Sequence, residues 1–174
     1  MSQFILNRKP SYVQEALYQE LRDLSRFYQN LTEDIVRAKN RLHKVLQVTF
    51  PELENILSSP TGEQYWNLVM AFPCNSFVLE LDDAALRAII RQSTAKRISE
   101  KRVTYLVDKL TKLANQSYYA LKKTSPIIEE VKYYAGELLR LSEYRQSVLG
   151  SIISVVGKTT VEIMELFECR QKVP

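Results

Sequence analysis

The chain has 174 residues with a formal net charge of +4, and 45% of its residues are hydrophobic. That apolar fraction is ordinary for a packed protein and argues against a disordered chain. No uncharged apolar run reaches the roughly 18 residues of a membrane span, and the first residues lack the pattern of a signal peptide. We therefore expect a protein of the cytoplasm with no membrane partner.

The residues that usually carry chemistry are scarce. Two cysteines, Cys74 and Cys169, and the single histidine, His43, are too few for a zinc site of four Cys and His ligands. No Ser-His-Asp or Cys-His set can be assembled from one histidine. Gly157-Lys158-Thr159 lacks the earlier glycine of a phosphate-binding loop, since position 152 is Ile. We expect no catalysis by this chain alone, no metal, no cofactor and no small-molecule substrate.

After a lead-in at residues 1–10, residues 11–50 predict one long helix. No Pro or Gly interrupts residues 11–49, and Ser11 can cap the start. Such a helix would be roughly 55–60 Å long at about 1.5 Å per residue. Apolar residues recur along it at alternating spacings of four and three, as in a coiled-coil seam. The seam residues are Leu17, Leu21, Leu24, Tyr28, Leu31, Ile35, Ala38, Leu42 and Val45.

The end of this helix is basic. Arg37, Arg41 and Lys44 share one face at spacings of four and three, and no acid lies between Ile35 and Pro51. Cations near a helix C-terminus are stabilising by themselves, so the cluster has a purely structural explanation. The same face would also suit a nucleic-acid backbone. Both interpretations remain open at this point.

Residues 51–125 predict an insert of small helices. Thr61 and Gln64 form a capping-box pattern, with Pro60 near the start of a helix that ends at Pro73. Trp66 fits the apolar core of this helix better than a base-stacking role. The other expected packing residues are Tyr65, Leu68, Val69 and Phe72.

Two further helices follow, one capped by Asp82 and one by Thr94 or Ser99. Arg87 and Arg91 should point outward from the first. Residues 84–128 hold ten Lys or Arg against two acids, a net charge of +8 that leaves −4 for the remainder. This asymmetry favours a polyanion partner. The candidate nucleic-acid contacts here are Lys96, Arg97, Lys101 and Arg102.

Residues 126–174 predict a second long helix that begins at Ser125-Pro126. Its coiled-coil seam comprises Ile127, Val131, Tyr134, Leu138, Leu141, Arg145, Val148, Ile152 and Val155. The expected fold is all-α, with two long coiled-coil helices and a small helical insert. The two seams could pair as a hairpin within one chain or between the chains of a homodimer, and the pattern does not separate these arrangements.

Two stretches resemble a known family. The first comprises residues 21–28, with Leu21-Arg22-Asp23-Leu24, running into residues 37–46, with Asn40-Arg41-Leu42-His43. It is similar to a segment of DEDD-type insertion-sequence transposases, the bridge-RNA-guided recombinases. Residues 138–160 more loosely resemble the second coiled-coil helix of that family and the start of its C-terminal domain.

The resemblance implies a helical segment that mediates assembly and helps hold DNA and structured RNA. In that family it lies between an acidic metal-binding domain and a domain with a serine nucleophile, so the segment itself lacks both catalytic centres. The alternative from another class is a coiled-coil protein–protein adaptor that does not bind nucleic acid.

Overall fold

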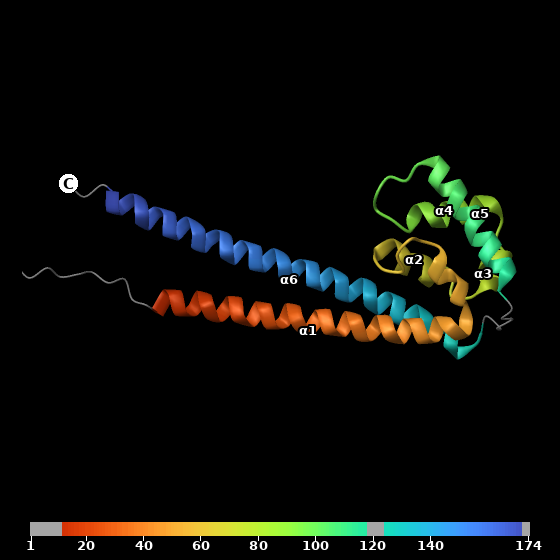
Figure 1. Ribbon diagram of the computed structural model, residues 1–174, viewed down its shortest axis with the longest axis horizontal. Helices are drawn as coiled ribbons and strands as arrows, with labels where there is room; N and C mark the ends of the chain where they lie inside the picture. The colour runs from red at the N-terminus through yellow and green to blue at the C-terminus, as the bar shows by residue number, and fades with distance from the viewer. Residues whose placement is uncertain (1–11, 118–123, 172–174) are drawn as a thin grey trace, which may run out of the picture. The chain divides into compact units, whose positions relative to one another are not determined.

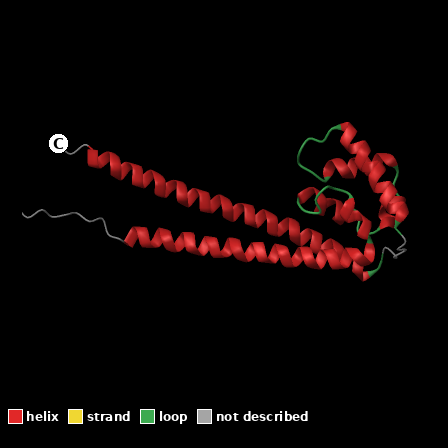
Figure 2. Ribbon diagram, in the orientation of Figure 1, coloured by secondary structure: helices red, strands yellow, loops and turns green. Residues whose placement is uncertain are grey.

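The structure is a computed structural model that describes residues 12–117 and 124–171. All regular structure in these ranges is helical (Figure 2), which confirms the all-α prediction. Ser11, Lys122 and Lys123 lie outside the described residues. The elements are α1 (Tyr12–Thr49), the 3₁₀ helix η1 (Pro51–Asn55), α2 (Glu63–Ala71), α3 (Asn75–Leu79), α4 (Asp83–Gln92), α5 (Glu100–Gln116) and α6 (Pro126–Gln171) (Figure 1).

The chain divides into two units whose boundaries fall inside the two long helices. We call residues 34–142 the central unit, and residues 1–33 with 143–174 the terminal unit. The central unit holds all the small helices together with the end of α1 and the beginning of α6. The two predicted seams therefore each contribute residues to both units.

The central unit buries most of its part of both seams within a single chain. Ile35 is 2% exposed and Leu138 is fully buried. The other buried seam residues of this unit are Ala38, Leu42, Val45, Val131 and Leu141. Their neighbours Leu46, Ile128 and Ala135 are also buried, whereas the predicted seam residues Ile127 and Tyr134 are only half-buried. Residues of α2 contact both long helices, since Lys39 Nζ lies 5.9 Å from the Trp66 ring centroid and a Cβ on Gly136 would lie 3.8 Å from Met70 Sδ. In this unit the apolar stripes are buried without a second chain.

Helix α5 packs against α3, α4 and η1. It buries Val103, Leu106, Val107, Leu110 and Ala114, which recur at helical spacing. The buried Asn75 of α3 binds the C-terminal end of α5. Its Nδ2 donates hydrogen bonds to the Ser117 carbonyl at 3.3 Å and to the Ala114 carbonyl at 3.5 Å. Helix α3 was not anticipated from the sequence, since five residues are too few to show a period.

The predicted start of α2 is wrong. The helix begins at Glu63, and the residue before it, Gly62, has φ +100°, a left-handed conformation that favours glycine. Thr61 does not cap the helix; its hydroxyl lies 2.7 Å from Ser59 Oγ. The expected packing residues of α2 are confirmed, because Tyr65, Trp66, Leu68, Val69 and Phe72 are all buried.

The predicted caps of α4 and α5 are confirmed. Asp82 Oδ1 accepts a hydrogen bond from the Ala85 amide at 2.8 Å at the start of α4. Of the two candidates before α5, Ser99 is the cap and accepts from the Arg102 amide at 3.4 Å. Pro126 is the first residue of α6.

In the terminal unit the seam is less completely covered. Leu17, Leu21, Leu24 and Tyr28 are partly exposed, whereas Leu31, Val148 and Val155 are buried. Gly157-Lys158-Thr159 belongs to α6, so this stretch is helix and not a phosphate-binding loop. Among the described residues no helix is both long enough and apolar enough to cross a membrane.

A glycine-to-alanine substitution should have opposite effects at Gly62, which has a positive φ, and at Gly136, which lies inside a helix. Gly62→Ala should lower the free energy of unfolding by about 1–2 kcal/mol, because a Cβ is strained at positive φ even in open space. Gly136→Ala, within α6 of the same unit, should raise it by up to about 1 kcal/mol through helix propensity. Urea unfolding followed by circular dichroism measures both, and two changes of equal sign would contradict these assignments.

Candidate nucleic-acid interface

Helix α5 has one buried side and one basic side. Opposite the apolar residues, Lys101, Tyr105, Asp108 and Lys112 follow one another at helical spacing, with Arg102 and Lys109 beside them. Lys96 and Arg97 lie in the loop that leads into this helix. We call Lys96, Arg97, Lys101, Arg102, Lys109 and Lys112 the α5 basic face, which includes all four candidate contacts predicted in this region.

Local hydrogen bonds shape the loop before α5. Thr94 Oγ1 accepts from the Lys96 amide at 3.2 Å, and Ser99 caps the helix. Short polar side chains that bond to nearby amides are typical of turns and helix starts. Lys96, Arg97, Lys101 and Arg102 are all exposed around this turn. Four exposed cations therefore follow closely along the chain, with Lys96 and Arg97 in the loop and Lys101 and Arg102 in the first turn of α5.

Two other arginines of the region are neutralised at the contact between α4 and α5. The Arg87 guanidinium bonds to Asp83 at 2.5 Å, to Glu100 at 3.0 Å and to Thr104 Oγ1 at 2.9 Å. Arg91 donates to the other Glu100 oxygen at 2.6 Å. With its side chain only 24% exposed, Arg87 contradicts the outward orientation predicted for it, whereas Arg91 is exposed as predicted.

The charge distribution follows from this pairing. Glu100, one of the two acids in the basic region, is bonded by Arg87 and Arg91. No member of the α5 basic face has an ion-pair partner among the described residues. Unpaired cations on one side of a helix keep their full attraction for a polyanion. The only acid on that side of α5 is Asp108.

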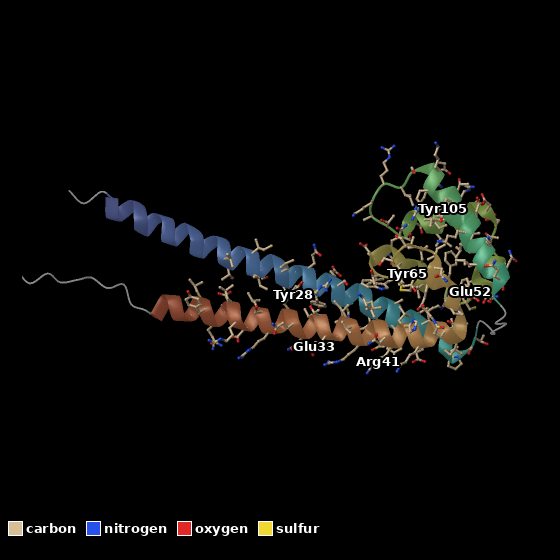
Figure 3. The ribbon with its side chains drawn as sticks, viewed as in Figure 1. Tyr28, Glu33, Arg41, Glu52, Tyr65 and Tyr105 are labelled. Carbon is tan, nitrogen blue, oxygen red and sulfur yellow. The ribbon has the colours of Figure 1, made fainter. Side chains whose placement is uncertain are left out.

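Tyr105 lies in the middle of the α5 basic face, where its side chain is 50% exposed (Figure 3). The Arg102 guanidinium carbon is 5.2 Å from the ring centroid, and Lys109 Nζ is 5.8 Å from it. Cation–π contacts at such exposed positions are worth about 0.5–1 kcal/mol each. Tyr105 and Lys109 were not among the contacts predicted from the sequence, although their helical spacing from Arg102 was available as a signal.

The basic residues predicted on α1 form a separate surface. Arg37, Arg41 and Lys44 are exposed, and Arg37 forms an ion pair with Asp34 at 2.9 Å. Figure 3 shows Arg41 on α1 well away from Tyr105 on α5 within the same unit. The two groups of predicted contacts therefore do not form one patch. We call Arg37, Arg41 and Lys44 the α1 basic triplet.

A small pocket of about 310 Å³ lies where α1, η1 and α2 meet. Its lining includes His43, whose Nδ1 lies 2.5 Å from Glu54 Oε1. Burial, and to a lesser extent the charge of Glu54, raises the pKa of Tyr65 well above its usual value, so this phenol stays protonated. Trp66 is buried beside the pocket, as its predicted core role requires. These groups join three elements of the central unit.

Metal chemistry finds no support in the part of the chain that the structure describes. No group of three or more His, Cys, Asp or Glu side chains lies close enough together there to hold a metal ion. Cys74 is buried, and its Sγ lies 2.9 Å from Ser76 Oγ. What the described surface does offer is exposed positive charge beside an aromatic ring.

Part of the chain matches a known protein family. Residues 4–51 match the model of the IS110-type DEDD transposase family. The match contains the first of the two stretches on which the resemblance rested and supports a role connected with DNA transposition. It ends before α2 and does not include α5. Searches among curated proteins and among solved structures gave no match.

The ion pairs of Glu100 predict a pH-dependent contribution to stability. Hydrogen bonds from Arg91, followed by the charges of both arginines, lower the pKa of Glu100 below its ordinary value of 4.5. A carboxylate with a lowered pKa stabilises the fold above its unfolded pKa, and the stabilisation is lost as the pH falls through the folded pKa. Glu100→Gln should therefore lower the melting temperature at pH 7, and its difference from the parent chain should shrink below about pH 4.5.

Asp108→Asn is the matched control, because Asp108 is an exposed acid on the same helix with no ion pair among the described residues. Thermal unfolding from pH 3 to pH 7 gives both comparisons. A Glu100→Gln difference that persists at pH 3, or one no larger at pH 7 than that of the control, would refute the ion-pair assignment.

Proposed function

We propose that this chain is an assembly and nucleic-acid-contacting segment of a transposase, acts in the cytoplasm on DNA and structured RNA, and contributes no catalytic centre of its own. The observation that carries the proposal is the α5 basic face, with six cations that lack ion-pair partners among the described residues. The family match at residues 4–51 supplies the connection with transposition.

The α5 basic face suits the phosphate backbone. Phosphates are bound mostly by Lys and Arg, and each contact releases counterions, so that affinity falls as salt rises. Lysines and arginines in a loop and the following helical turn can bridge several phosphates along one strand. The α1 basic triplet is a second, weaker contact in this proposal, because Asp34 neutralises part of the charge of Arg37.

The charge assignment predicts a change in salt dependence. Lys101→Gln with Arg102→Gln should weaken binding to an RNA hairpin and to duplex DNA, and should reduce the slope of log K against log salt by about 2. Fluorescence anisotropy at several salt concentrations measures the slope.

The matched control is Lys132→Gln with Arg140→Gln, which removes the same net charge. Both residues are already paired on α6, Lys132 with Glu129 and Arg140 with Glu137. The slope of this control should change much less. If both pairs of substitutions change the slope of log K against log salt equally, the α5 basic face does not make the phosphate contacts. If the parent chain does not bind at low salt, the protein–protein adaptor is favoured instead.

The assembly part of the proposal is a homodimer made through the terminal unit. Its seam residues Leu17, Leu21 and Leu24 stay partly exposed in the single chain, and Ile153 of α6 is 64% exposed. Apolar stripes on long helices are commonly covered by a second helix in a coiled coil. The central unit, by contrast, already covers its own stripes, so the intrachain and interchain alternatives apply to different halves of the two helices.

Light scattering tests the dimer. The parent chain should have twice the mass of one chain at about 50 μM, and Leu21→Lys with Leu24→Lys should return it to one chain, because a charge at a seam position opposes pairing. Ser25→Lys, on an exposed position of the same helix, should leave the mass unchanged. A parent chain that is monomeric at this concentration would contradict the dimer.

A further inference from the structure

We infer that Tyr105 is a stacking platform for an unpaired nucleobase, held between cations that bind the phosphates on either side of that base. The inference rests on the proposed function, since it names the kind of nucleic acid that the α5 basic face would hold. The ligand is single-stranded nucleic acid, or an unpaired nucleotide in a structured one.

The position of Tyr105 supports this role. Its ring is half exposed at the centre of the α5 basic face, on the side of the helix opposite Val103, Leu106 and Leu110. The side chain therefore does not belong to the core that holds α5 in place. An exposed aromatic ring among lysines and arginines is the arrangement by which single-strand-binding surfaces combine stacking with charge.

The neighbouring cations can give way to a base. Arg102 and Lys109 lie at 5.2 and 5.8 Å from the ring centroid, and both contacts are at the protein surface. Stacking of a base on an aromatic ring is generally stronger than an exposed cation–π contact. A base can therefore replace one cation over the ring, while that cation turns to the phosphate next to the base.

The geometry favours unpaired over paired bases. Tyr105 projects from a helix whose neighbours on the same side, Lys101 and Lys112, are also exposed. A ring on such a surface can meet the flat face of a base only when that face is not stacked in a duplex. Paired bases offer only their edges in the grooves, so duplexes would contact the lysines and arginines but not the ring.

The test compares Tyr105→Ala with Tyr105→Phe in the full chain. The probes are one unstructured sequence of about 12 nucleotides as RNA and as DNA, and a duplex of the same sequence. Tyr105→Ala should weaken binding to the single strands about five- to one-hundred-fold, leave duplex binding within about two-fold and keep the salt slope. Tyr105→Phe retains the ring and should bind all probes like the parent chain. The RNA and DNA arms show which single strand is preferred.

The outcomes separate this inference from the proposed function. If the parent chain binds single strands and duplex, but Tyr105→Ala affects both equally or neither, the platform is wrong and the phosphate contacts stand. If the parent chain binds none of the probes at low salt, the proposed function and the platform both fail. Circular dichroism of Tyr105→Ala should match the parent chain, since the ring is half exposed.

Discussion

The structure depends on burial of the apolar stripes that α1 and α6 carry within the central unit. Ile35 and Leu138 are almost completely removed from water there, and Trp66 and Met70 of α2 contact the two long helices. Removal of a Leu or Ile side chain from water stabilises a fold by about 1.5–3 kcal/mol. Several such residues on two helices give the small helices, which are too short to be stable alone, a surface on which to fold.

The second organising interaction is electrostatic. Glu100 binds Arg87 and Arg91, and so joins the first turn of α5 to α4. The carboxylates of Asp83 and Glu100 are thereby paired at this contact, whereas the cations on the opposite side of α5 have no ion-pair partner among the described residues. The same helix can thus pack closely through one face and attract a polyanion through the other. This division of charge between a contact and a surface is the physical basis of the proposed function.

Much of the fold could be predicted from local sequence signals. The long helices, the caps Asp82 and Ser99, and the apolar residues of α2 and α5 follow from periodicity and short-range hydrogen bonding. Helix α3 is too short to have a detectable period. The start of α2 depends on the positive φ of Gly62. The Thr61–Gln64 capping-box pattern predicted an earlier start, so the sequence did not indicate this role of Gly62.

The candidate site was only partly predictable, because charge pairing depends on tertiary contacts. Arg87 and Lys101 look alike in the sequence, yet Arg87 pairs with Glu100 once α4 packs on α5, whereas Lys101 has no ion pair among the described residues. The ion pair of Arg37 with Asp34, by contrast, is local, because the two residues lie three positions apart on α1 and this spacing was available in the sequence. Helical spacing could have placed Tyr105 beside Arg102, but its exposure became known only with the packing of α5.

The most direct test of the account is lysine acetylation of the full chain, quantified by mass spectrometry with and without an RNA hairpin. The account predicts that Lys96, Lys101 and Lys112 react more slowly in the complex, while Lys132, which is paired with Glu129 on α6, keeps its reactivity. Unchanged reactivity of the α5 lysines in a saturated complex would contradict it.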